Sequence, residues 1–122
     1  MYKPLKEYVT QSDELKKLII ENPDLPLIAM VNYEVCADDD YRWWFAPSLI
    51  FEIGYILDCE QTVNEERIYD DEDEFEEDLE NYLVDSGEYD NLSDDEFDKV
   101  VAEELKKYEP YWKKVIYIRA TV

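Results

Sequence analysis

A run of carboxylates from Asp70 to Asp98 constrains this chain more than any other feature. The run contains sixteen Asp and Glu residues and no Lys, Arg or His. Such a block is normally disordered, because its charges repel one another and few apolar groups offset the loss of chain entropy. The rest of the chain carries 17 acidic and 12 basic residues, so the formal net charge of -21 comes mainly from this run.

An apolar stripe inside the acidic run predicts a helix instead of a disordered segment. A folded core can bury such a stripe while the carboxylates stay in water. We therefore expect a helix over residues 71–83, capped by Asp70 or Asp71 and ended near Gly87. The stripe has the spacing of one helical face and consists of Phe75, Leu79, Tyr82 and Leu83.

The residue types present argue against an enzyme. Histidine is absent, which removes the commonest general base and metal ligand. The two glycines, Gly54 and Gly87, are too far apart in the sequence to form a phosphate-binding loop. Cys59 lies between Asp58 and Glu60, whose charges raise the pKa of its thiol and make it a poor nucleophile. We therefore predict a protein without enzymatic activity and without a cofactor.

The N-terminal part of the chain predicts a helix followed by a strand. Residues 3–8 read as a short turn, and Thr10 or Ser12 can cap a helix through residue 21. An Asn-Pro pair then stops this helix. The continuous apolar run over residues 27–31 has the length of a strand, and we expect it to be the buried central strand of a sheet.

The aromatic segment at residues 41–46 predicts a second strand. We expect it to pair antiparallel with residues 27–31 through a turn at residues 37–40, with its aromatic rings in the core. Its mixture of aromatic rings with Arg42 is also typical of a base-stacking platform for single-stranded nucleic acid. The core is the favoured interpretation, because the sequence offers no basic groove to support such a platform.

Three further segments have the composition of strands. Residues 49–57 suit a strand through their β-branched and aromatic content, although their apolar spacing also fits a helix, and we favour the strand. Residues 63–69 predict an edge strand with charged side chains toward water. Residues 113–120 predict a final strand.

A capping box at Ser93 and Glu96 is the clearest helix start in the chain, because each residue can satisfy the other's free backbone donor. It predicts a helix to about Tyr108, ended by Pro110. Together the elements predict an α+β fold. We expect a single domain over residues 1–122, with an antiparallel or mixed sheet and helices packed on one face.

The expected location is the cytoplasm. The N-terminus lacks an apolar signal region, and no apolar run approaches the roughly 18 residues of a membrane span. Cys36 and Cys59 lack the spacing of a redox or zinc motif, and we expect free core thiols in a reducing compartment. The strong negative charge disfavours direct contact with nucleic acid or anionic membranes and favours a basic protein partner.

Carboxylates on a folded helix predict binding to a basic surface. Side chains four residues apart lie about 6 Å apart along a helix, and phosphate charges recur every ~3.4 Å along each DNA strand. A rigid anionic ridge can therefore compete for a surface that binds DNA or RNA. The residues expected to make this contact are Asp70, Asp71, Asp73, Glu74, Glu76, Glu77, Glu80, Asp94 and Asp95.

Two other interpretations of the acidic residues stay open. In the first, the carboxylates form only a solvated face that keeps an interaction or structural protein of a mobile element in solution. The second interpretation is weak binding of Ca²⁺ or Mg²⁺ at residues 38–40 or 70–74. Neither segment has the alternating ligands and central glycine of an EF-hand loop. No dedicated metal site is therefore predicted.

The acidic segment at residues 69–78, Tyr-Asp-Asp-Glu-Asp-Glu-Phe-Glu-Glu-Asp, is similar to stretches in phage and mobile-element accessory proteins. Among these it resembles anti-CRISPR proteins that mimic DNA on a type II effector. That resemblance implies an inhibitor whose partner is the basic site that reads the protospacer-adjacent duplex of a CRISPR effector nuclease. The pattern at residues 41–45, 66–69 and 108–112 also resembles uncharacterised small proteins of bacterial mobile elements and implies no activity.

Overall fold

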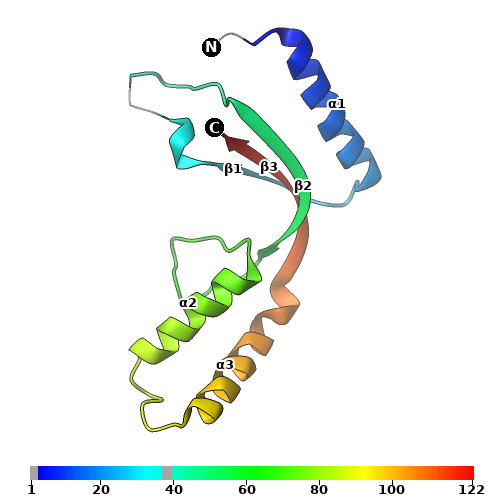
Figure 1. Cartoon of the computed structure of the whole chain (residues 1–122). Coiled ribbons are helices and arrows are strands. Elements are labelled where there is room, and N and C mark those ends of the chain that lie inside the picture. Colours follow the sequence, from blue (N-terminus) through cyan, green and yellow to red (C-terminus); the bar gives the residue numbers. More distant parts are fainter. Residues whose placement is uncertain (1–2, 37–39) are drawn as a thin grey trace. The chain divides into compact units, whose positions relative to one another are not determined.

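The computed structural model describes residues 3–36 and 40–122 and confirms the α+β class, with a three-stranded mixed sheet in this part of the chain. Contacts divide the chain into two compact units. The first unit comprises residues 1–54 and 114–122, and the inserted unit comprises residues 55–113. The elements shown in Figure 1 are α1 (Leu5–Glu21), β1 (Leu27–Val31), η1 (Tyr33–Val35), β2 (Ser48–Leu57), α2 (Glu72–Asp85), α3 (Asp94–Tyr108), η2 (Glu109–Tyr111) and β3 (Trp112–Thr121).

The sheet of the first unit is built around β3, which lies between β1 and β2. β1 runs parallel to β3, from Leu27 opposite Ile116 to Val31 opposite Ala120. Residues 115–117 of β3 are buried, whereas residues along β1 alternate between exposed and half-buried. The prediction of a strand at β1 is therefore confirmed, but its predicted place at the buried centre of the sheet is wrong.

The first helix is continuous, and its predicted division into a turn and a capped helix is wrong. The hydroxyl of Ser12 donates to the carbonyl of Tyr8 at 2.8 Å, and that of Thr10 donates to the carbonyl of Lys6 at 3.5 Å. Both hydroxyls are therefore bonded within the helix instead of capping its start. The predicted end is confirmed, since α1 stops at Glu21.

The aromatic segment at residues 41–46 forms no strand, and its predicted place in the core is wrong. Trp43 is 86% exposed and Phe45 is 88% exposed. The predicted turn before it includes residues 37–39, which lie outside the described part of the chain. β1 takes its hydrogen bonds from β3, near the opposite end of the chain, so this pairing overrides the strand propensity of the nearer aromatic segment.

The favoured strand at residues 49–57 is confirmed as β2. Its internal glycine has a packing reason, because a Cβ placed on Gly54 would clash with the ring of Tyr117. The ring therefore packs directly on the backbone of β2. Arg119 covers the same ring at 4.5 Å and forms an ion pair with Glu52.

Two capped helices dominate the inserted unit, and both predicted caps are confirmed. The carboxylate of Asp71 accepts hydrogen bonds from the N–H groups of Asp73 and Glu74. The hydroxyl of Ser93 accepts the N–H of Glu96, as the capping box predicts. α2 and α3 pack together over a hydrophobic core formed by Leu57, Tyr69, Phe75, Leu79, Leu83 and Val101.

The end of α2 differs in one detail from the prediction. Gly87 has a φ of 73°, the left-handed conformation that glycine adopts readily after a helix, as expected there. Tyr82, however, is exposed, and its predicted inward orientation is wrong. The buried stripe of α2 is limited to Phe75, Leu79 and Leu83, because Tyr82 lies at the margin of that face.

The segment between β2 and α2 is a loop, so the edge strand predicted for residues 63–69 is wrong. The amide side chain of Gln61 organises this loop, accepting from the N–H of Asn64 at 2.8 Å and donating to the carbonyl of Arg67 at 3.2 Å. These bonds satisfy backbone groups that a strand would pair with a neighbour. No helix of the described chain is both long and apolar enough to cross a membrane.

Candidate partner-binding surface

The negative charge of the chain is concentrated in the inserted unit. This unit holds 23 acidic and 5 basic residues, for a net charge of -18, whereas the first unit holds 10 acidic and 7 basic residues, for a net charge of -3. The acidic helix and its surroundings therefore form a strongly anionic body on their own. Long-range attraction of a basic molecule therefore comes mainly from the inserted unit.

The outer side of α2 carries exposed carboxylates that no cation neutralises. Asp73, Glu77 and Glu80 follow one another at intervals of four and three residues, so they share one face of the helix. In the part of the chain that the structure describes, no Lys or Arg forms an ion pair with these three residues or with Glu76. From Asp73 to Glu80 the face extends about 10 Å along the axis.

The opposite side of α2 explains why this face is rigid. Phe75 is fully buried, and Leu79 and Leu83 are nearly so. The ring of Phe75 makes edge-on contacts with the rings of Tyr108 and Trp112, at centroid distances of 4.9 and 6.1 Å. The carboxylates are therefore held on a packed helix whose position is set by aromatic contacts, and their geometry does not depend on a partner.

Asp94 and Asp95 lie apart from the first turn of α2. They are exposed in the first turn of α3, where the helix dipole favours negative charge. α3 follows α2 through a short loop, so its start lies near the end of α2 (Figure 1). The nine predicted contact residues are consequently spread over about 20 Å, the length of α2, and do not gather at one point.

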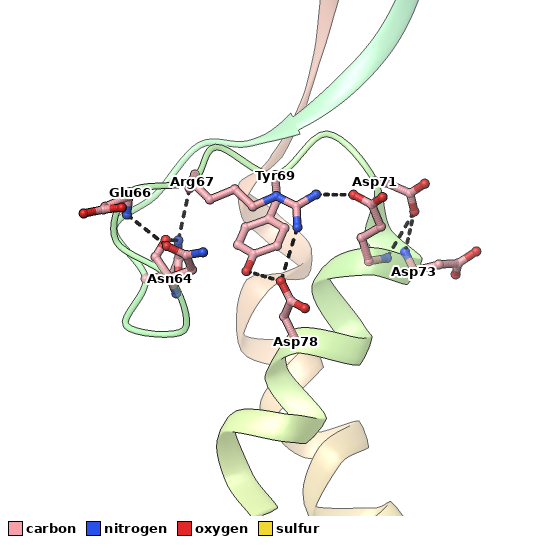
Figure 2. A network of polar contacts seen from close by, with 9 residues as sticks. Asn64, Glu66, Arg67, Tyr69, Asp71, Asp73 and Asp78 are labelled. Carbon is pink, nitrogen blue, oxygen red and sulfur yellow. Dashed lines mark hydrogen bonds and ion pairs between the residues drawn. The ribbon is translucent and has the colours of Figure 1, made fainter. Parts of the chain in front are cut away.

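A polar network at the start of α2 pairs Glu74 with a cation of the preceding loop. The guanidinium of Arg67 forms ion pairs with Glu74 and with Asp78, the latter at 3.3 Å (Figure 2). The same guanidinium lies 4.6 Å from the centre of the Tyr69 ring. Glu74 therefore helps to hold the loop against α2 while its side chain stays 52% exposed, and its role as a contact residue stays a prediction.

The hydroxyl of Tyr69 completes this network by donating a 2.6 Å hydrogen bond to Asp78 (Figure 2). Burial of the ring, together with this bond to a carboxylate, raises the pKa of the Tyr69 phenol to about 12. The tyrosine is thus a proton donor over the whole physiological range. In Figure 2 the side chain of Asp73 points away from Arg67 and Asp78, and the residue is exposed, which leaves its carboxylate available to a partner.

Sequence reasoning missed the roles of Arg67 and Tyr69, although the position of Arg67 carries a signal. Arg67 is the last cation before the acidic run, and a lone cation beside many carboxylates is expected to pair with them. Asp70, also predicted as a contact residue, is half-buried beside this network, while Asp71 is used as the cap of α2. Both are positioned by the fold before any partner binds.

Neither metal ligation nor thiol chemistry is favoured by the described geometry. Among residues 3–36 and 40–122, no group of three or more Cys, Asp or Glu side chains is arranged to hold a metal ion. Cys36 and Cys59 are free, but the predicted core position of Cys36 is wrong, because its side chain is exposed. Burial and the charge of Asp58 raise the pKa of the Cys59 thiol, which lowers its reactivity as a nucleophile.

The residues that remain as a candidate contact face are Asp73, Glu76, Glu77 and Glu80 on α2, with Asp94 and Asp95 on α3. All six are exposed and belong to the inserted unit. No family model, no curated protein and no solved structure matches this chain.

Proposed function

We propose that this protein is a non-enzymatic inhibitor that mimics nucleic acid. Its exposed carboxylates occupy a basic surface with which another protein binds DNA or RNA. The observation that supports this most directly is the outer face of α2, where Asp73, Glu77 and Glu80 are exposed, unpaired with any described cation and fixed on a packed helix.

The fixed geometry matters because ordering a flexible acidic tail on binding costs free energy. A preformed helix avoids most of that cost. Solubility alone needs a far smaller charge than -18 in one unit of 59 residues, and concentrated like charge destabilises the folded state. A surface that carries such a penalty is better explained by a partner than by solvation.

The chemistry of the face defines the partner. Carboxylates spaced along a rigid helix suit a groove lined by Lys and Arg that otherwise holds a phosphate backbone. The resemblance of residues 69–78 to anti-CRISPR proteins makes a CRISPR effector nuclease the first partner to test. Such an inhibitor acts in the cytoplasm of a bacterial cell, inherited with a phage or another mobile element.

The decisive experiment compares two triple charge reversals. Asp73→Lys, Glu77→Lys and Glu80→Lys change the outer face of α2, and the matched control reverses three exposed acids of α1, Asp13, Glu14 and Glu21. Both variants change the net charge equally. We expect the α2 variant to lose partner binding at least a hundredfold and the α1 variant to lose little, with the fold of both confirmed by circular dichroism.

The partner is first captured from a bacterial lysate with the tagged wild-type chain, and captured nucleases are then tested in purified form. Double-stranded DNA added in excess should displace the protein from such a nuclease. Equal losses from both triple variants would show that only net charge matters. Loss from neither variant, or binding that excess DNA does not disturb, would refute the proposal.

A further inference from the structure

The outer edge of β1 presents unpaired backbone groups. Within a strand, the N–H and C=O of one residue point to the same side, and successive residues alternate. The carbonyl of Pro26 accepts from Ile116, and the N–H of Asn32 donates to Ala120, so the even-numbered residues of β1 face β3. The N–H and C=O groups of Leu27, Ala29 and Val31 therefore point away from the described sheet.

This edge lacks the features that usually block strand pairing. Natural edge strands are protected by charged side chains, proline, bulges or a covering segment. The sequence of β1 is Leu-Ile-Ala-Met-Val, without charge, proline or glycine. Leu27 is 48% exposed, Val31 is 62% exposed, and Ala29 between them is also exposed. The outward N–H and C=O groups of β1 are therefore available to pair with another strand, and the side chains of the same residues are exposed.

Charge decides what kind of strand can approach. The proposed basic partner is selected by the inserted unit, whereas β1 has no charge and belongs to a unit with a net charge of only -3. Two first units repel each other weakly at physiological salt. An uncharged apolar edge matches best with an edge of the same composition, and a second copy of this chain supplies one.

We propose that two copies of this protein associate by antiparallel pairing of β1 with β1, with the twofold axis at Ala29. In this register Ala29 lies opposite Ala29 of the second copy, and Leu27 lies opposite Val31. Every residue with outward backbone groups then forms a hydrogen-bonded pair across the axis. The two three-stranded sheets become one continuous sheet, which is a closed, symmetric arrangement.

The side chains of β1 support this register. The small Ala29 lies at the centre, where two identical side chains meet, and the larger Leu27 and Val31 meet as apolar pairs on either side. A shift by one residue would place each outward-facing residue of one copy opposite a residue of the other copy whose N–H and C=O already bind β3. No ladder of hydrogen bonds would then form between the copies. A shift by two residues would keep a ladder but leave one outward-facing residue of each β1 unpaired, so the register about Ala29 is the one that pairs Leu27, Ala29 and Val31 together.

Sedimentation velocity over a concentration series tests the proposal on the full-length chain. The wild type should sediment with the mass of two chains at about 0.3 M salt, where charge repulsion is screened. Ala29→Pro removes an outward N–H without removing a bond to β3, and it should yield a monomer with an unchanged circular dichroism spectrum. Ala29→Val keeps that N–H and should remain dimeric.

Ala29→Lys gives a second, independent reading if the proline variant fails to fold. This substitution lowers the net negative charge and so weakens the general repulsion between copies, yet it places two ammonium groups opposite each other at the axis. A shift to monomer therefore identifies the β1 edge. A wild type that stays monomeric throughout the series, or folded proline and lysine variants that both stay dimeric, would refute the proposal.

Discussion

Tyr69 shows how one residue changes the role of a segment. Tyr69 is the last residue of the segment 63–69, which was predicted as an edge strand. Its side chain is only 1% exposed, and its ring contacts the Phe75 ring edge-on at a centroid distance of 5.0 Å. The hydroxyl still finds a partner in Asp78. A buried ring with a satisfied hydroxyl anchors the loop to α2, and the anchor depends on the protonated phenol.

The shifted pKa of Tyr69 predicts a loss of stability at high pH. In the unfolded chain the phenol loses its proton near its ordinary pKa of 10.0, whereas the folded chain keeps it to about pH 12. The unfolded state therefore binds fewer protons between these values, so a stability contribution that is complete below pH 10 is lost as the pH rises toward 12. The free energy of unfolding should fall by about 1.4 kcal/mol per pH unit from this group.

Urea unfolding from pH 8 to pH 11.5 measures this slope. Tyr69→Phe should lower the stability at pH 8 by about 1 kcal/mol, because the bond to Asp78 is lost, and it should flatten the decline above pH 10. Tyr33→Phe is the matched control, since it removes the hydroxyl of a tyrosine that is 85% exposed. An alkaline slope that is the same in both variants would contradict the assignment.

The candidate site was predictable at residue level only in part. Charge placed Asp73, Glu77 and Glu80 among the predicted contact residues, and the structure shows that all three are exposed on one helix face. The pairing of Glu74 was not predictable in the same way. It depends on where the preceding loop places Arg67, and that placement comes from the Gln61 amide and the buried Tyr69 ring.

At the scale of elements, helices were predicted better than strands because their signals are local. The Asp71 and Ser93 caps act within three residues, and both helices begin where these residues stand. Strands depend on partners that are distant in sequence. β1 pairs with β3, which lies about 90 residues away, so its position at the edge of the sheet could not be predicted from local composition. For the same reason, local composition did not predict that residues 41–46 form no strand.

The acidic helix α2 should form without a metal ion, because its order comes from burial. Phe75, Leu79 and Leu83 are each buried, and a fully buried side chain of this kind contributes about 1.5 to 3 kcal/mol. This exceeds the repulsion expected between neighbouring exposed carboxylates, about 0.2 to 0.5 kcal/mol per pair. The helix is thus maintained against its own charge by the core.

Circular dichroism with a chelator tests this at the level of the element. Helix content in excess chelator should equal that in buffer, and addition of Ca²⁺ or Mg²⁺ should leave it unchanged. Leu79→Ala provides the contrast, since loss of its packing should lower stability by about 2 to 5 kcal/mol. A large gain of helix on adding Ca²⁺ would instead favour the interpretation of the acidic run as a cation-binding segment.

At the scale of the whole molecule, the two units differ in the forces that they offer to partners. The inserted unit has a net charge of -18 and few exposed large apolar side chains, whereas the first unit is nearly neutral and exposes Leu27, Val31, Trp43 and Phe45. Electrostatic attraction can therefore act mainly through one unit and apolar strand pairing through the other. The sequence alone showed the acidic run, but not that the neutral remainder forms a separate compact unit.

These two forces respond to salt in opposite directions, which separates the two proposals in one set of measurements. Binding of a basic nuclease releases counterions and is screened, so its affinity should fall by a factor of about ten or more between 50 and 200 mM salt. Pairing through β1 brings together two chains that each carry a net charge of -21, so screening should strengthen it. Nuclease affinity and dimer dissociation constant, measured in the same buffers, should therefore change with opposite sign. A nuclease complex that tightens with salt would contradict mimicry, and a dimer that weakens with salt would contradict pairing through an uncharged edge.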